Sequence, residues 1–233
     1  MENTFLGTDK IGEIVSKFPG ASYLFKDNHI DFCCGGDRTL TAALMELKLE
    51  EDEFLAKLNV TYAASKIIQT LKVNWLEAAS TDLIEYVVST HHGYLQKELP
   101  VLSELINKIV RVHGPNHGEM LLKLNQLFQL MKKELEQHLI AEEQLAFPLI
   151  KEYDLIPSAI LLNKINETLA ELETEHSTVG DLLKEMRAVT NDYELPEDAC
   201  RTYTLTFHKL EEMEADLFQH IHLENNILFP RYA

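Results

Sequence analysis

The hydrophobic residues recur with a helical period over most of the chain. From the Ser80-Thr81-Asp82 cluster onward, apolar residues return every three or four positions, the spacing of helices that bury one face. Four long segments have this period, and breaks that contain proline separate them. The segments cover about residues 82–113, 118–151, 158–190 and 197–228. Strand-like alternation is scarce. The pattern predicts an all-α fold with an up-down four-helix bundle over residues 81–233.

The first 60 residues show a different pattern of short periodic stretches. These are interrupted by Phe18-Pro19-Gly20 and by the turn-like Cys-Cys-Gly-Gly-Asp run at 33–37. A last short helix is expected from Glu51 to Leu58. We therefore predict a small N-terminal helical domain over residues 1–60, which contains Cys33 and Cys34, and a connector over residues 61–80.

Each predicted bundle helix carries a histidine on its apolar stripe. These residues are His92, His138, His176 and His220, and the second and fourth are followed one turn later by Glu142 and Glu224. The pattern His-x3-Glu-x4-Phe-Pro thus occurs twice, at residues 138–148 and 220–230. In the second helix we expect the stripe to continue through Leu145 and Leu149.

The four histidines are expected to lie at one level of the bundle. In an antiparallel pair of helices, residues equidistant from the connecting turn lie beside each other. Pro115 is the midpoint between His92 and His138, and Pro157 is the midpoint between His138 and His176. For the last pair of histidines the midpoint is residue 198, also beside a predicted loop. The six polar side chains should therefore converge inside the bundle.

Metal binding explains this convergence better than ordinary packing does. A single histidine on such a stripe is most often a core residue, and a metal-free structural bundle is the weakest alternative. Two buried carboxylates, however, are costly unless they are paired or bound to a cation. Six mixed nitrogen and oxygen ligands are too many for one tetrahedral zinc ion and suit iron or manganese. We expect two iron ions in a non-haem, oxo-bridged centre, with terminal histidines and with Glu142 and Glu224 as bridges.

The composition and charge exclude several classes of protein. The 233-residue chain has a formal net charge of −17, which argues against nucleic acid or anionic lipid as a partner. No apolar run approaches the roughly 18 residues that span a bilayer, and the N-terminus lacks a secretory signal pattern. Three cysteines, two of them adjacent, are not a disulfide framework. We expect a cytoplasmic protein.

The ligand candidates resemble the di-iron site of a hemerythrin-like domain: His92, His138-x3-Glu142, His176 and His220-x3-Glu224. Together with DFCCGGD at 31–37 and LENNILFPR at 223–231, they make the chain similar over nearly its whole length to the RIC (repair of iron centres) family. The resemblance implies repair of iron–sulfur clusters damaged by nitric oxide or oxidants, by donation of iron. It also implies iron–sulfur proteins as clients, and nitric oxide, dioxygen or peroxide as small ligands.

One departure from oxygen-carrying hemerythrins bears on the function. Their third metal-binding helix has His-x3-His, whereas here Gly180 stands four residues after His176. A missing imidazole leaves an open coordination position, which favours reactive or labile iron over reversible oxygen carriage. The alternatives are a nitric oxide reductase or peroxidase-type enzyme and a hemerythrin-like oxygen-binding or sensing protein. Whether the protein is an enzyme, and whether it forms a homodimer, stay open.

The remaining cysteines and histidines receive weaker predictions. Cys33 and Cys34 are interpreted as redox or iron-handling thiols in an exposed turn, with a buried structural pair as the alternative. Cys200 is expected to be structural. His113 lies about 30 Å along the first helix from His92, at about 1.5 Å per residue, and is left outside the site. Four residues are expected off the apolar stripes: His91, His222, Glu143 and Glu175. For Glu175, a role around the metal ligands or in proton transfer is left open.

Overall fold

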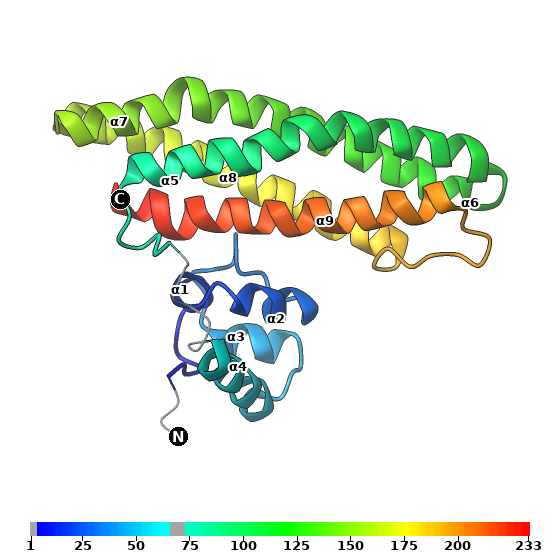
Figure 1. Cartoon of the computed structure of the whole chain (residues 1–233), viewed down its shortest axis with the longest axis horizontal. Coiled ribbons are helices and arrows are strands. Elements are labelled where there is room, and N and C mark those ends of the chain that lie inside the picture. Colours follow the sequence, from blue (N-terminus) through cyan, green and yellow to red (C-terminus); the bar gives the residue numbers. More distant parts are fainter. Residues whose placement is uncertain (1–3, 66–72) are drawn as a thin grey trace. The chain divides into compact units, whose positions relative to one another are not determined.

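The regular elements of the protein are helices. The computed structural model describes residues 4–65 and 73–233. Within these two ranges the named elements are α-, π- and 3-10 helices, and an isolated bridge pairs Lys10 with Thr39. Figure 1 shows these helices coloured along the chain. The predicted all-α fold is confirmed.

Four short helices form the N-terminal part. They are α1 (Ile11–Lys17), α2 (Ala21–Asp27), α3 (Leu40–Glu46) and α4 (Glu51–Ser65). Their buried faces form one apolar core, in which the rings of Phe25 and Phe54 stack at 5.9 Å between centroids.

Helix α4 continues beyond Leu58, where the sequence pattern predicts its end. Tyr62 accounts for the extension, because its ring lies 4.9 Å from that of Phe5 and 5.3 Å from that of Phe18. The predicted connector, residues 61–80, therefore begins as helix, and its part from 66 to 72 lies outside the described residues.

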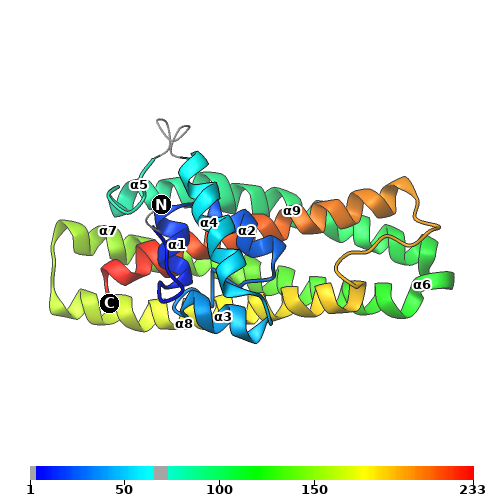
Figure 2. The same ribbon diagram turned by 90° about the horizontal axis from the view of Figure 1, so that it is seen from below.

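The C-terminal part contains the long helices of the bundle. Its elements are α5 (Ser80–Val87), η1 (Val88–His92), α6 (Gly93–Ala141), η2 (Glu142–Ala146), α7 (Phe147–Leu155), α8 (Ala159–Thr190), α9 (Arg201–Leu223), η3 (Glu224–Leu228) and η4 (Phe229–Arg231). Figures 1 and 2 show α6, α8 and α9 running along a common direction. By its internal contacts the chain divides into two compact units, residues 84–217 and residues 1–83 with 218–233.

The first two predicted bundle helices are joined by a kink inside α6. His117 leaves the helical conformation (φ −128°, ψ 22°), two residues after Pro115. The ring of Pro115 removes one backbone donor at this point, which weakens the helix there. Figure 1 shows the chain running out along the first half of α6, turning near the kink and returning to α7. The break predicted at Gly114-Pro115 thus lies within three residues of the observed kink at His117.

The apolar stripe of the second bundle helix shifts by one residue after Glu142. Leu145 and Leu149 were expected inside, but Leu145 is half exposed, and Ala146 and Ile150 are buried instead. The prediction is wrong for Leu145, and Leu149 is only partly buried, because η2 is a π-helical turn. A π turn contains one residue more than an α turn, so every later side chain moves on by one position.

A buried ion pair connects α8 with α9. Both carboxylate oxygens of Glu214 accept from Arg187 Nε, at 2.7 and 2.9 Å. The Glu214 side chain is only 1% exposed, whereas Arg187 keeps 19% of its side-chain surface. Arg187 also bonds Asp192 and lies over the ring of Tyr193. The guanidinium therefore compensates a carboxylate that has been removed from water.

Within residues 4–65 and 73–233, no helix combines the length with the apolar composition that a membrane crossing requires.

Candidate metal centre

Three π-helical turns lie at the positions of predicted ligands. η1 ends at His92, η2 begins at Glu142 and η3 begins at Glu224. Each is closed by an N–H that donates to the carbonyl five residues earlier: Gly93 to Val88, Phe147 to Glu142 and Phe229 to Glu224. Such turns are frequent at functional sites, because the additional residue redirects the neighbouring side chains.

The Phe-Pro end of the repeated motif accounts for two of these turns. Proline has no N–H, and its ring clashes with the carbonyl four residues earlier in a regular α-helix. Pro148 and Pro230 immediately follow the phenylalanines that close η2 and η3. The wider π turn accommodates the proline ring while the phenylalanine N–H still finds a carbonyl. The motif therefore encodes the local backbone as well as two possible ligands.

Glu142 lies between two histidines of the unit formed by residues 84–217. Its Oε2 is 3.2 Å from His92 Nε2, and its Oε1 is 3.4 Å from His138 Nε2. His138 Nε2 is in turn 2.9 Å from His176 Nε2. All four side chains are buried, and Glu142 is 0% exposed. A carboxylate that faces two imidazoles with its two oxygens has the arrangement needed to bridge two cations.

The end of α9 supplies a second pair of the same type. His220 Nε2 lies 3.0 Å from Glu224 Oε1, across the one turn that separates the two residues. Both side chains are buried, with Glu224 at 0% exposure. The two copies of the repeated motif therefore place histidine and glutamate alike.

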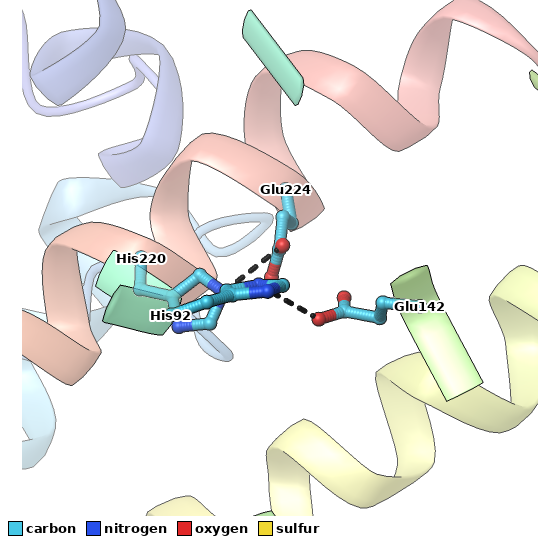
Figure 3. Close-up of side chains that lie close together, drawn as sticks. All are labelled: His92, Glu142, His220 and Glu224. Carbon is cyan, nitrogen blue, oxygen red and sulfur yellow. Dashed lines mark hydrogen bonds and ion pairs between the residues drawn. The ribbon is translucent and has the colours of Figure 1, made fainter. Parts of the chain in front are cut away.

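The six predicted ligands fall into two sets that share their glutamates. One set is His92, Glu142, His220 and Glu224, and the other is His138, Glu142, His176 and Glu224. Within each set the available nitrogen and oxygen atoms all lie within 4.8 Å of one another. Figure 3 shows the side chains of the first set pointing toward one another. Two positions thus offer two imidazoles and two carboxylates each.

Carboxylates outside the two sets orient two of the imidazoles. Glu143 Oε1 lies 2.8 Å from His92 Nδ1, and Glu175 Oε2 lies 2.7 Å from His138 Nδ1. The bond with His138 lowers the pKa of Glu175 from its ordinary value. A hydrogen bond at Nδ1 leaves Nε2 to face inward, as in most histidines that bind metals. Both glutamates lie off the stripe; an outer role had been left open for Glu175, whereas that of Glu143 is visible only in three dimensions.

The chemistry of this donor set fits divalent or trivalent cations of the iron type. Neutral imidazole nitrogen and carboxylate oxygen together suit iron and manganese better than thiolate-preferring ions. Two fully buried carboxylates carry a large desolvation cost, which a bound cation offsets. Since each set contains the same two glutamates, two cations could share them.

Comparison with known proteins agrees with this geometry. A family model described as "Hemerythrin HHE cation binding domain" matches residues 83–232. A second, described as "Domain of Unknown function (DUF542)", matches residues 7–62. The first match covers more than half of the chain and includes all six predicted ligands.

The chain is also similar to curated proteins over almost its whole length. It is 30% identical to the iron-sulfur cluster repair protein ScdA of Staphylococcus haemolyticus, with 96% of this chain and 97% of the relative covered. Identity to ScdA of Staphylococcus epidermidis is 31%, with 97% and 98% covered. Identity to the iron-sulfur cluster repair protein YtfE of Escherichia coli O81 is also 31%, with 95% and 94% covered. The chain belongs to the ScdA/YtfE family of hemerythrin-domain proteins. The resemblance inferred from the sequence motifs is confirmed.

Three further histidines of the hemerythrin domain contact residues outside the two ligand sets. His91 was expected at the periphery but is buried, with Nδ1 2.9 Å from Asp216 Oδ1. His222 is also buried, and its ring lies 5.9 Å from that of Phe32. His91 lies within the π turn η1, which the period of a regular helix does not describe, and the burial of His222 depends on Phe32, a residue distant in the sequence. His113 pairs with Cys200 and stays outside the two ligand sets.

The two adjacent cysteines lie in a turn organised by Asp31. Its Oδ1 accepts from the N–H groups of Cys33, Cys34 and Gly35, at 3.2, 3.1 and 3.0 Å. The two sulfur atoms are 3.7 Å apart, and Asp31 with the two thiols forms a third group of potential metal ligands.

The burial of this turn differs from the expectation of an exposed one. Cys33 is buried, with 3% exposure, whereas Cys34 is intermediate. The hydrogen bond to Cys34 and burial raise the pKa of the Cys33 thiol well above its ordinary value. Cys34 is thus the more accessible of the pair.

Asn226 connects the cysteine turn with η3. Its Nδ2 donates to the carbonyls of Phe32 and Cys33, at 3.4 and 3.1 Å. A β-carbon at Gly12 or Gly36 would collide with the Asn226 side chain, so both positions require glycine for this approach. The turn that begins with Glu224 therefore also carries the residue that holds the thiol loop.

Proposed function

We propose that this protein binds two iron ions in its hemerythrin domain and donates iron to damaged iron–sulfur clusters. In this proposal His92, His138, His176 and His220 are terminal ligands, and Glu142 and Glu224 bridge. The observation that carries the pairing of ions is the division of Glu142 between two histidines, one for each oxygen. The repair function rests on the near full-length similarity to ScdA and YtfE.

The proposed roles follow from the side chains of this chain. The histidines bind as neutral imidazoles, and Glu143 and Glu175 keep two of their rings in place through Nδ1. Bound iron would supply the cargo for repair and, when reduced, a partner for nitric oxide or oxidants. Gly180, one turn after His176 and also buried, contributes no donor atom. An ion with an incomplete set of protein ligands is easier to release, which suits donation better than storage.

Metal analysis of protein purified without oxygen tests the ligand assignment. We expect about two iron ions per chain, one for each ligand set, and Mössbauer spectra of a coupled pair. A single zinc ion in a fully metallated preparation would contradict the proposal.

Transfer to a damaged cluster tests the function itself. The iron-loaded protein is mixed with a [4Fe–4S] dehydratase that nitric oxide has inactivated, and iron and dehydratase activity are followed together. Donation predicts that activity returns as iron leaves the protein. Recovery with all iron retained would contradict donation, and catalytic formation of nitrous oxide would instead support the nitric oxide reductase alternative.

The cysteine turn gives a separate prediction for the same assay. Replacement of Cys33 and Cys34 by serine should leave the iron content unchanged and slow cluster repair by about tenfold, because hydroxyl groups are poor replacements for thiolate ligands of iron. The matched control is Cys200→Ser, which removes a thiol at another position and should repair at the normal rate. Equal repair by all three proteins would show that the turn takes no part in it.

A further inference from the structure

A histidine and a cysteine form a close pair outside the metal centre. His113 Nε2 lies 3.2 Å from Cys200 Sγ. His113 is buried at 8% exposure, whereas Cys200 is exposed. His113 is about 30 Å along the helix from His92, at about 1.5 Å per residue, so the pair does not belong to the predicted ligand sets. Cys200 was expected to be structural, and its exposure makes it accessible to a reactant in solution as well.

Cys200 also stands at the start of α9, where backbone donors have no partner within the helix. The N–H groups of Thr202 and Tyr203 bond its sulfur. The positive end of a 23-residue helix favours a negative charge at this position. These contacts, the hydrogen bond from His113 foremost, lower the pKa of Cys200 to about 7. The lower pKa increases the fraction of exposed Cys200 that is thiolate at neutral pH.

The neighbouring groups keep the imidazole directed at the sulfur. The ring of Tyr203 meets that of His113 edge-on, with centroids 5.1 Å apart. The nearby carboxylate, Asp198, is engaged by His117 Nε2 at 2.8 Å and by Asn116 Nδ2 at 3.1 Å. Its negative charge is thus shared with these two residues of α6, which limits its repulsion of a thiolate.

We propose that Cys200 is a site of thiol–disulfide exchange with low-molecular-weight disulfides, and that His113 is its positioning residue. The Cys200 thiolate attacks one sulfur of the disulfide, whose S–S bond breaks as a new S–S bond forms with Cys200. The second sulfur leaves as a thiolate with the bonding electron pair and takes a proton from water. One disulfide bond replaces another, so no separate oxidant is needed.

Full-length protein with Cys33→Ser and Cys34→Ser tests this proposal, because Cys200 is then the remaining one of three cysteines. The protein is incubated with 2-hydroxyethyl disulfide from pH 5.5 to 10, and the adduct is followed by intact mass. The rate should rise with a midpoint near pH 7. In protein unfolded by urea the midpoint should return to about 8.5, the ordinary value of a thiol.

Two variants separate the effect of His113 from a general effect of the surface. His113→Gln should raise the midpoint by about one pH unit or more, whereas its rate at pH 7 falls only about threefold, because a more basic thiolate is also more nucleophilic. The matched control is His208→Gln, which removes an exposed histidine of α9 paired with Glu211 and should leave the midpoint within about 0.3 units.

The Cys33→Ser, Cys34→Ser protein, without any change at His113, can also overturn the proposal. A midpoint near 8.5 in the folded protein, or no adduct at neutral pH, would do so whether or not the His113 variant folds. An unchanged midpoint in a His113→Gln protein with a native circular dichroism spectrum would assign the low value to the helix alone and remove the role of His113.

Discussion

Replacement of Glu142 by leucine is expected to abolish binding of the iron pair. Glu142 belongs to both ligand sets and faces His92 and His138 with different oxygens. Leucine has a similar volume but no donor atom, so both cations lose a ligand and the bridge between them. We expect the iron content to fall from about two ions to well below one per chain. Metal analysis after anaerobic reconstitution measures this directly.

The matched control for this experiment is Glu136→Leu. Glu136 lies six residues earlier, in α6, and its half-exposed side chain pairs with Lys132 at the surface. The same chemical change there should leave the iron content unaltered. The metal-free Glu142→Leu protein should also be at least as stable as the metal-free parent, because the substitution removes a buried carboxylate. Retention of both ions would show that the ligand assignment is wrong.

Among substitutions at partly exposed residues of α8, the removal of the Arg187 guanidinium should lower the free energy of unfolding most. In Arg187→Met the carboxylate of Glu214 keeps its 1% exposure but loses both of its short hydrogen bonds to Nε. Removal of one member of a buried charge pair costs about 3–5 kcal/mol. Urea unfolding of the metal-free protein measures the change without a contribution from metal binding.

Two further variants show whether the loss comes from the buried charge. Lys184→Met, one turn earlier on α8, breaks an exposed ion pair with Asp181 and should change the stability by less than about 0.5 kcal/mol. Arg187→Met combined with Glu214→Leu should recover most of the loss, since neither charge remains. If the double variant is as unstable as the single one, the guanidinium acts through packing against Tyr193 instead.

The periodic pattern predicts much of the bundle because helix packing follows local spacing. The third bundle helix was expected at 158–190 and is observed as Ala159–Thr190, with Ser158 accepting from the N–H of Leu161 at its start. A single proline-containing break likewise locates the kink in α6. These features depend on residues close in sequence, and the corresponding signals are strong.

The errors occur where the local period changes or where distant residues decide the environment. The exposed Leu145 follows the π turn, which an analysis at 3.6 residues per turn does not include. His91 is buried inside the π turn η1, whereas His222 is buried where it packs against Phe32, which is distant in the sequence. The pairing of His113 with Cys200 joins residues 87 positions apart, and nothing in the spacing of either residue indicates it. The Phe-Pro ending was a usable signal for the π turns.

The closeness of Asn226 to Gly12 and Gly36 bears on how relatives of this protein can be recognised. A side chain at either glycine would displace the amide that holds the carbonyl of Cys33. A relative with alanine at position 12 or 36 could retain every histidine and glutamate of the centre and both cysteines. Its cysteine turn would nevertheless lose the hydrogen bonds that connect it with η3. Ligand residues alone are therefore an insufficient criterion for shared activity, and two small positions without any chemistry of their own belong in the signature.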